Sequence, residues 1–193
     1  MDTKNFKPSD IFSCLSLNTE EMALVNSKFE KYYLPKGEIL IKAGETVKHQ
    51  YFVYSGCLRT YYINQQGKEH TLQFAIHDWW ISDYTAYFTT SKAIMNIESL
   101  QNAILYKISR LDLEYLYQQI PKIESFSRRK LEGSFSGFHK RILSNLAQSA
   151  KERYVSFINT YPNIEQNIKN YHIASYLGIT TESLSRIRKE LAQ

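Results

Sequence analysis

Cysteine is scarce in this chain of 193 residues, which contains only Cys14 and Cys57. Two thiols are too few for a disulfide framework, and too few for the four-cysteine sites that hold zinc or an iron–sulfur cluster. We therefore expect a protein of a reducing compartment, the cytoplasm, that carries no metal and no other cofactor.

Long apolar runs are missing as well. The longest, such as residues 74–76 and 103–106, are far too short to cross a bilayer, so we expect no membrane partner. No apolar core follows residues 1–5, which argues against a signal peptide. Hydrophobic residues (43%) and charged residues (22%) occur in the proportions of a folded globular protein, which excludes a disordered chain.

Basic residues are concentrated in the second half of the chain. The formal net charge of +5 divides into −1 for residues 1–120, +4 for residues 121–148 and +2 for residues 149–193. A basic C-terminal part indicates contact with a polyanion. Lysines and arginines on ordinary solvated helices would give the same excess, and on charge alone that second interpretation is the better one.

Short segments rich in β-branched and aromatic residues follow one another between about residues 34 and 108. They are residues 39–41, 51–54, 58–63, 71–74 and 104–108. Glycines separate them at turn positions, and all four prolines of the chain lie outside them. Short strands at this spacing predict an antiparallel sandwich or barrel.

From about residue 110 the apolar period becomes helical. Apolar residues three or four positions apart predict one long amphipathic helix over residues 121–148. They are Ile123, Phe126, Leu131, Phe135, Phe138, Ile142 and Leu146. This stripe needs a covering surface, either its own domain or a second copy of the chain in a coiled-coil-like seam. A further helix over residues 151–159 ends before Pro162.

Residues 170–189 have the layout of a helix-turn-helix. In the first helix Ile173 and Leu177 share the inner face, and Ala174 is small where two helices must cross closely. Gly178 stands at the turn, where glycine adopts a left-handed conformation without strain. A chance match to so many constraints is rare, so the motif is a strong signal.

The second helix of the motif follows a suitable N-cap residue, Thr180. The apolar residues predicted to pack on the first helix are Leu184, Ile187 and Leu191. The opposite, polar face is predicted to bind DNA. The predicted DNA-binding residues are Thr180, Thr181, Glu182, Ser183, Ser185, Arg186 and Lys189.

Two residues of this face can read bases in a major groove. Arg186 can donate two hydrogen bonds to guanine, and Glu182 can accept one from cytosine N4. Thr181, Ser183 and Lys189 suit phosphates. The alternative is that Glu182 and Arg186 form an exposed i, i+4 ion pair with no partner outside the protein. Within a complete helix-turn-helix, we favour DNA recognition.

The chain resembles the Crp/Fnr family of bacterial transcription regulators over nearly its whole length. The resemblance rests on residues 34–38, 44–45, 51–59, 67–69, 173–180 and 182–187. It implies an α+β fold: an N-terminal antiparallel β-roll (a cyclic-nucleotide-binding-like jelly roll), a long dimerisation helix and a C-terminal helix-turn-helix. The implied domains are residues 1–148, for effector binding and dimerisation, and residues 149–193, for DNA binding.

The resemblance also implies partners and a function. The chain is expected to be a homodimer that binds double-stranded DNA and regulates transcription, with RNA polymerase as a candidate protein partner. Glu182 and Arg186 fall on the family's base-contacting positions. The family often adds a β-hairpin wing after the reading helix. This chain stops at Gln193, so we expect no wing.

One departure from the family concerns the effector. Members that bind cyclic nucleotides carry a Gly-Glu pair and an arginine in the phosphate-binding cassette. The matching residues 78–84 have no such pair, and no arginine lies between Arg59 and Arg110. A buried phosphate would lack its bidentate donors. We predict that cyclic AMP is not the effector, and the identity of any small-molecule effector stays open.

The matching segment is instead rich in aromatic residues. These could line an apolar ligand pocket, or their side chains could fill the space that a nucleotide occupies elsewhere, which is the simpler interpretation. Candidate pocket residues are Trp80, Asp83, Tyr84 and Lys92. A haem bound through Cys57 and His77 is a further alternative, although single histidines are more often structural.

The sequence also argues against two other classes of function. A cupin-type metalloenzyme needs clustered histidines, but no two of the five histidines are close in sequence, and no nucleophile or phosphate-loop motif is present. We therefore predict that the chain is not an enzyme. A signalling module that binds a ligand and a protein partner but no DNA is the third class. The basic C-terminal part and the complete reading helix argue against it.

Overall fold

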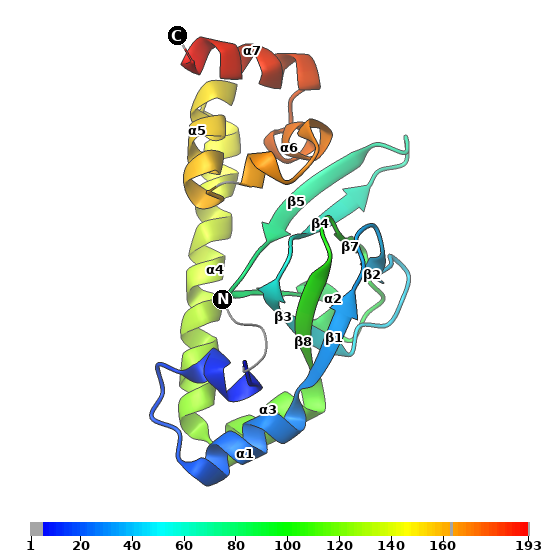
Figure 1. The fold of residues 1–193 in the computed structure, drawn as a ribbon. Coiled ribbons are helices and arrows are strands. Elements are labelled where there is room, and N and C mark those ends of the chain that lie inside the picture. The colour runs from blue at the N-terminus through cyan, green and yellow to red at the C-terminus, as the bar shows by residue number, and fades with distance from the viewer. Residues whose placement is uncertain (1–5, 163, 193) are drawn as a thin grey trace. The chain divides into compact units, whose positions relative to one another are not determined.

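Figure 1 shows the computed structural model of the chain, which describes residues 6–162 and 164–192. Our expectations about residues 1–5 and about the chain end at Gln193 lie outside these residues. The chain forms two compact units. The first consists of Met1–Arg59 and Phe74–Glu132, and the second of Thr60–Gln73 and Gly133–Gln193.

The strands of the described residues form two four-stranded sheets, with orders β1-β8-β3-β6 and β2-β7-β4-β5. They are β1 (Glu30–Leu34), β2 (Ile39–Ile41), β3 (His49–Ser55), β4 (Leu58–Ile63), β5 (Glu69–Ala75), β6 (Trp79–Ile81), β7 (Asn96–Ser99) and β8 (Ala103–Ser109). Strand β8 runs antiparallel to both β1 and β3, β6 runs antiparallel to β3, and β7 runs antiparallel to β2. The predicted antiparallel β architecture is confirmed.

Short helices accompany the sheets in the first unit. They are η1 (Pro8–Phe12), α1 (Thr19–Lys28), α2 (Tyr84–Thr89) and α3 (Arg110–Gln119). The sheet that contains β3 and β8 is buried on both faces, because side chains alternate along a strand. Phe52 and Ile108 join a cluster with the helices, whereas Val53 and Leu105 join a second cluster with Leu58. This is why these strands read as nearly continuous apolar runs.

The long helix α4 (Pro121–Ala147) agrees with the predicted helix over residues 121–148. Only the start of its apolar stripe is covered within the chain: Ile123 and Phe126 are buried in the first unit. The remaining apolar side chains are exposed by 41% to 79%. They are Leu131, Phe135, Phe138, Ile142, Leu143 and Leu146. No helix in the described part of the chain is both long and apolar enough to cross a membrane.

The second unit continues with α5 (Ala150–Thr160), η2 (Ile164–Gln166), α6 (Asn170–Leu177) and α7 (Thr181–Leu191). The helix predicted over residues 151–159 corresponds to α5, which ends at Thr160 with Tyr161 as its C-cap, directly before Pro162. Phe157 of α5 is buried and packs in tilted geometry against Tyr161 and Tyr176, so an aromatic cluster joins α5 to α6.

The same unit contains the arm of residues 60–73, which is formed by parts of β4 and β5 and their turn. Ser175 Oγ of α6 accepts hydrogen bonds from Thr71 N at 2.9 Å and donates to Glu69 O at 3.0 Å. Arg141 Nη2 donates to Thr71 O at 3.0 Å and to Tyr176 O at 3.1 Å, with its guanidinium 3.9 Å from the Tyr176 ring centre. We call this set the arm–α6 contact.

Candidate nucleic-acid interface

The turn between α6 and α7 has the geometry that the sequence predicts. Gly178 caps α6 with a φ of 68°, in the left-handed region. Its N–H donates to Ser175 O at 3.3 Å, and Ile179 N donates to Ala174 O at 3.0 Å. These two bonds satisfy carbonyls that the end of a helix leaves open. The chain can therefore reverse within three residues.

Helix α7 is fixed at its start and along its inner face. Thr180 is the N-cap as predicted, and its Oγ1 accepts from Ser183 N at 3.2 Å. Leu184 and Ile187 are buried. The prediction that Leu191 is buried is wrong, because this side chain is 43% exposed. Leu191 is the last residue of α7, and the buried apolar face ends one turn earlier, at Ile187.

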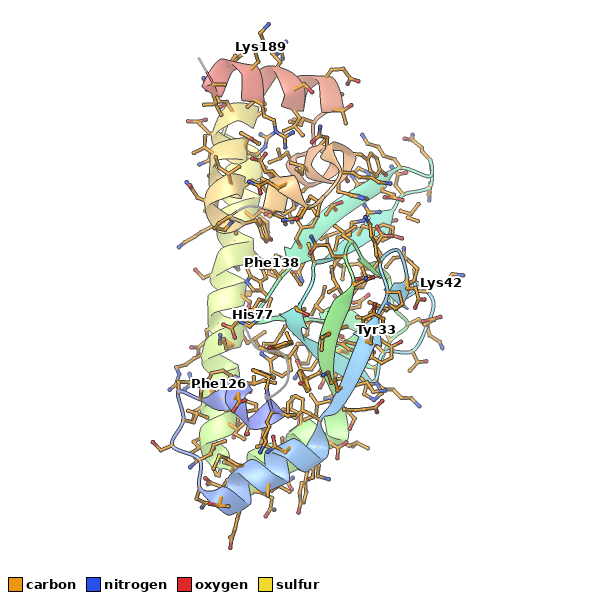
Figure 2. All side chains as sticks on the ribbon, viewed as in Figure 1. Tyr33, Lys42, His77, Phe126, Phe138 and Lys189 are labelled. Carbon is orange, nitrogen blue, oxygen red and sulfur yellow. The ribbon has the colours of Figure 1, made fainter. Side chains whose placement is uncertain are left out.

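The outer face of α7 is open to solvent. Glu182, Ser185, Arg186 and Lys189 are exposed, and Figure 2 shows Lys189 directed away from the helix. Within residues 6–162 and 164–192, Arg186 has no hydrogen-bond or ion-pair partner, and the ion pair with Glu182 does not form. The alternative that Arg186 is held by Glu182 on the protein surface therefore finds no support in the structure.

The carboxylate of Glu182 is held in its charged form. Hydrogen bonds from its own backbone N–H and from the hydroxyls of Thr180 and Thr181 keep the pKa of Glu182 below its ordinary value. The distance from Thr181 Oγ1 to Glu182 Oε1 is 3.1 Å. An ionised carboxylate can only accept hydrogen bonds, as a contact to cytosine N4 requires. Ser185 Oγ donates to Thr181 O at 2.9 Å and so is engaged within the helix.

The charge around this face is positive. Residues 133–193 hold eight lysines and arginines against four acids, a net charge of +4. Lys189 and Arg186 lie three positions apart, on the same side of α7, and both are exposed. The outer face of α7 thus offers hydrogen-bond donors and positive charge together with one acceptor.

The four candidate pocket residues lie in the first unit, and the structure shows what each of them contacts. Asp83 is fully buried, and its carboxylate accepts from the backbone N–H groups of Ala86, Ile94 and Met95 at 2.9–3.1 Å. It caps α2 and ties down the segment before β7. This carboxylate is committed to the fold, not exposed to a ligand.

The other three candidates have separate surroundings. Trp80 packs edge-on against Phe52, with ring centres 5.5 Å apart. Tyr84 stacks on Phe88 at 5.6 Å. Lys92 is exposed, and its Nζ donates to Thr46 Oγ1 at 2.9 Å. Trp80 and Tyr84 therefore pack against other aromatic side chains of the protein, whereas Lys92 lies on its surface.

A cavity of about 280 Å³ is present elsewhere in the first unit. Its lining residues are Leu40, Ile41, Glu45, Thr46, Val47, Lys48, His49 and Tyr51. Burial lowers the pKa of His49, with a further contribution from the Lys107 charge. None of the four candidates lines this cavity, and the sequence analysis did not predict it, because its walls come from a loop and parts of two strands.

The chain is similar to known proteins in sequence. The family model of the cyclic nucleotide-binding domain matches residues 31–120. The fumarate and nitrate reduction regulatory protein of Salmonella typhi is 26% identical over 186 residues, covering 89% of this chain and 73% of that protein. Its counterpart in Escherichia coli K12 is 25% identical with the same coverage. The chain therefore contains a cyclic-nucleotide-binding-like domain and is similar, over most of its length, to DNA-binding transcription regulators of the Crp/Fnr type.

Solved structures establish the fold independently. FixK2 from Bradyrhizobium japonicum has a TM-score of 0.74 at 17% identity, covering 85% of this chain and 84% of that one. A Crp/Fnr-family transcriptional regulator from Eubacterium rectale has a TM-score of 0.68 at 21% identity, covering 91% and 84%. The predicted α+β fold of the family, with its antiparallel β-roll, is confirmed.

The roll of this chain offers little to bind an anion at Arg59 and in residues 78–84. Arg59 lies near the middle of the sheet formed by β4 and β7, with its side chain 3% exposed, and its Nε donates to the Glu98 carboxylate. A guanidinium already bound to a half-buried carboxylate is engaged within the protein and is not a free bidentate donor to a phosphate. The matching residues 78–84 contain Asp83 and no basic residue.

The geometry also bears on the haem alternative. His77 Nδ1 lies 2.7 Å from Tyr54 O, which engages one ring nitrogen within the protein. Burial raises the pKa of the Cys57 thiol to about 12, so it is a neutral thiol at physiological pH. Within the described residues, no three His, Cys, Asp or Glu side chains gather in a way that could hold a metal ion.

Sequence reasoning overlooked two residues of the second unit. Ser175, inside the predicted helix-turn-helix, and Arg141, on the predicted long helix, make the arm–α6 contact, a role that the sequence analysis did not assign to either. Their partner Thr71 is 104 positions from Ser175. No local periodicity could have found this pair.

Proposed function

We propose that the chain acts as a homodimer that binds double-stranded DNA at specific sites, with α7 as the reading helix. The observation that carries the proposal is the outer face of α7. There Arg186 is exposed and unpaired beside an ionised Glu182, while Leu184 and Ile187 anchor the opposite face. Donors and an acceptor at fixed positions on a rigid helix are what major-groove recognition requires.

Each residue of this face has a proposed role. Arg186 donates two hydrogen bonds to a guanine, and Glu182 accepts one from a cytosine. Thr181, Ser183 and Lys189 contact phosphates, which position the helix without reading sequence. Thr180 and Ser185 line the same interface, and their hydroxyls also bind within α7.

The exposed part of α4 supports the homodimer. Phe135, Phe138, Ile142 and Leu146 recur at intervals of three or four and are 41–79% exposed. An apolar stripe of this kind is stable in water when a second helix covers it. We infer that two copies pair along α4 and place their two α7 helices in successive major grooves, about 34 Å apart, on a near-palindromic site.

The proposal also covers the domains, the effector, the protein partner and the site of action. Residues 1–148 would serve dimerisation and effector binding, and residues 149–193 would bind DNA. Cyclic AMP would not be the effector, because Arg59 is bound to Glu98 and the cassette supplies Asp83. RNA polymerase would be the protein partner at the promoter, the site of action would be the cytoplasm, and no catalytic step would be involved.

Selection of binding sites from genomic fragments by the purified full-length chain tests the proposal. We expect enrichment of a near-palindromic sequence with two half-sites one helical turn apart. A chain that enriches no sequence, under conditions where it is folded, would contradict the proposal and favour the ligand-binding module that acts through a protein partner.

A further inference from the structure

Arg188 lies on a different side of α7 from Arg186. The two residues are two positions apart, which places their side chains about 200° apart around the helix axis. The side chain of Arg188 is only 29% exposed, whereas Arg186 is exposed. If Arg186 faces a duplex, Arg188 faces the interior of the helix-turn-helix.

The guanidinium of Arg188 binds groups from three other elements. Nη2 and Nε donate to Glu165 Oε1 of η2 at 2.6 and 3.0 Å. Nη1 donates to Asn170 Oδ1, on the first residue of α6, at 2.7 Å. Nε also donates to the hydroxyl oxygen of Tyr154 in α5 at 3.2 Å. The Tyr154 hydroxyl in turn donates to Glu165 Oε1 at 2.6 Å. One side chain of α7 is therefore bonded to α5, η2 and α6.

The hydrogen bonds of Arg188 fix the rotation of α7 about its own axis, which the apolar contacts of this helix leave free. Leu184 and Ile187 hold α7 against its neighbours, but apolar contact is non-directional and permits small rotations about the helix axis. Hydrogen bonds to a charged group are short and directional. Because the Arg188 guanidinium is planar and bonds in several directions at once, it resists rotation of the helix.

We propose that Arg188 is a positioning residue of the reading helix: bound to Glu165, Asn170 and Tyr154, it sets the rotation of α7 so that Glu182 and Arg186 meet the base edges, and it does not touch DNA itself. This inference rests on the function proposed above. It assigns to Glu165 a role in DNA recognition, through Arg188.

The role of Glu165 gives the inference its sharpest consequence. Removing an acid from a DNA-binding module should strengthen binding to a polyanion, if charge alone matters. The network predicts the opposite for Glu165→Gln, because the loss of the carboxylate releases Arg188. Glu190 is a matched control, since it is an exposed acid of α7 that forms only a long ion pair, 3.9 Å from Lys151 Nζ.

Arg188 has its own matched control in Lys189. Arg188→Gln and Lys189→Gln each remove one positive charge from adjacent positions of α7. Loss of a phosphate contact lowers the slope of log affinity against log salt concentration by about one. Arg188→Lys is a third test, because it keeps the charge and loses the planar set of donors.

The experiment measures the affinity of the full-length chain and of each variant for the selected site and for unrelated DNA, over a series of salt concentrations. Circular dichroism establishes that each variant is folded, and stoichiometric titration gives its active fraction.

We expect Arg188→Gln, Arg188→Lys and Glu165→Gln to lose about 10-fold in affinity for the selected site. We expect their salt slopes to equal that of the wild type, and their binding to unrelated DNA to change less than twofold. Lys189→Gln should lower the slope, and Glu190→Gln should bind as tightly as the wild type or more tightly.

Two results would overturn the inference. One is a lower salt slope for Arg188→Gln with affinity preserved in Arg188→Lys, which would make Arg188 a phosphate contact. The other is a Glu165→Gln variant that binds as tightly as Glu190→Gln. Both results presuppose wild-type binding, so they are distinct from failure of the proposed function, in which the wild type itself selects no site and the inference falls with it.

Discussion

At the scale of single residues, Arg186 and Lys189 share a face of α7 but differ in what they can recognise. A guanidinium matches the two acceptors of guanine, whereas an ammonium acts as a point charge. We expect Arg186→Ala to cost about 1–3 kcal/mol at the selected site and to relax the preference for one base pair. Lys189→Ala should weaken binding to all sequences alike. Competition binding with sites mutated at each position measures the difference, and an Arg186→Ala variant with unchanged preference would remove Arg186 from the reading role.

A second residue-scale prediction concerns the stability of the roll. Gly56 has a φ of 95°, and a Cβ built there would lie 2.7 Å from the Cα of Ala103. Gly67 has a φ of 76°, and a Cβ built there would have nothing within 4 Å. Gly56→Ala therefore adds a clash with the backbone to the strain of a left-handed alanine, and should lower the free energy of unfolding by about 2–4 kcal/mol. Gly67→Ala should cost about 1 kcal/mol. Equal losses in denaturant unfolding would contradict the packing that we describe.

At the scale of elements, one hydroxyl group makes the direct side-chain bonds from α6 to Thr71 in the arm–α6 contact. Ser175 Oγ accepts from both the amide and the hydroxyl of Thr71, at 2.9 and 3.1 Å. In Ser175→Ala the Thr71 amide loses its acceptor, so its hydrogen exchange should become faster. Ser185→Ala is the control, because Ser185 is exposed on α7 and bonds only within that helix. Unchanged exchange at Thr71 in Ser175→Ala would mean that the contact is not formed in solution.

Helix α4 gives the second prediction at this scale. Ile142 is 56% exposed, and a charge there leaves the core of a single chain intact. We expect Ile142→Glu to weaken self-association by at least about 10-fold, because it would bury a charge in an apolar seam. Lys140→Gln changes the net charge by the same amount, at a position about 200° away around the helix. Sedimentation equilibrium compares the two variants, and equal dimer constants would rule out this face of α4 as the seam.

At the scale of the whole molecule, the question is what the roll senses. Asp83 and Arg59 are both buried and hydrogen-bonded to other groups of the protein. Arg59 therefore offers a phosphate no free guanidinium, and Asp83 offers it a carboxylate instead of a donor. We expect titration calorimetry with cyclic AMP to give no saturable heat, and DNA affinity to be the same with and without it. Saturable binding at micromolar cyclic AMP would show that another part of the roll holds the phosphate.

Predictability differs from element to element for physical reasons. The segment 58–63 agrees with β4 end to end, because its β-branched and aromatic residues leave little choice. Strands β1 (Glu30–Leu34) and β7 (Asn96–Ser99) were not predicted, since their charged and polar residues hide the strand pattern. Both pair with strands far away in the chain, and that pairing, not intrinsic propensity, makes them strands.

The sequence alone determined the features that arise from contacts between near neighbours. These include the period of α4, the turn at Gly178, the cap at Thr180 and the exposed face of α7, since all depend on residues within one or two helical turns. Only the tertiary structure decided which polar side chains are free to act. Asp83 is bound by backbone groups up to 12 positions away, and Arg188 by Glu165, 23 positions away, whereas Arg186 is open. In the sequence, a charged residue looks the same whether its side chain is bound within the protein or open to solvent. Only its folded surroundings distinguish a residue that recognises DNA from one that holds the fold together.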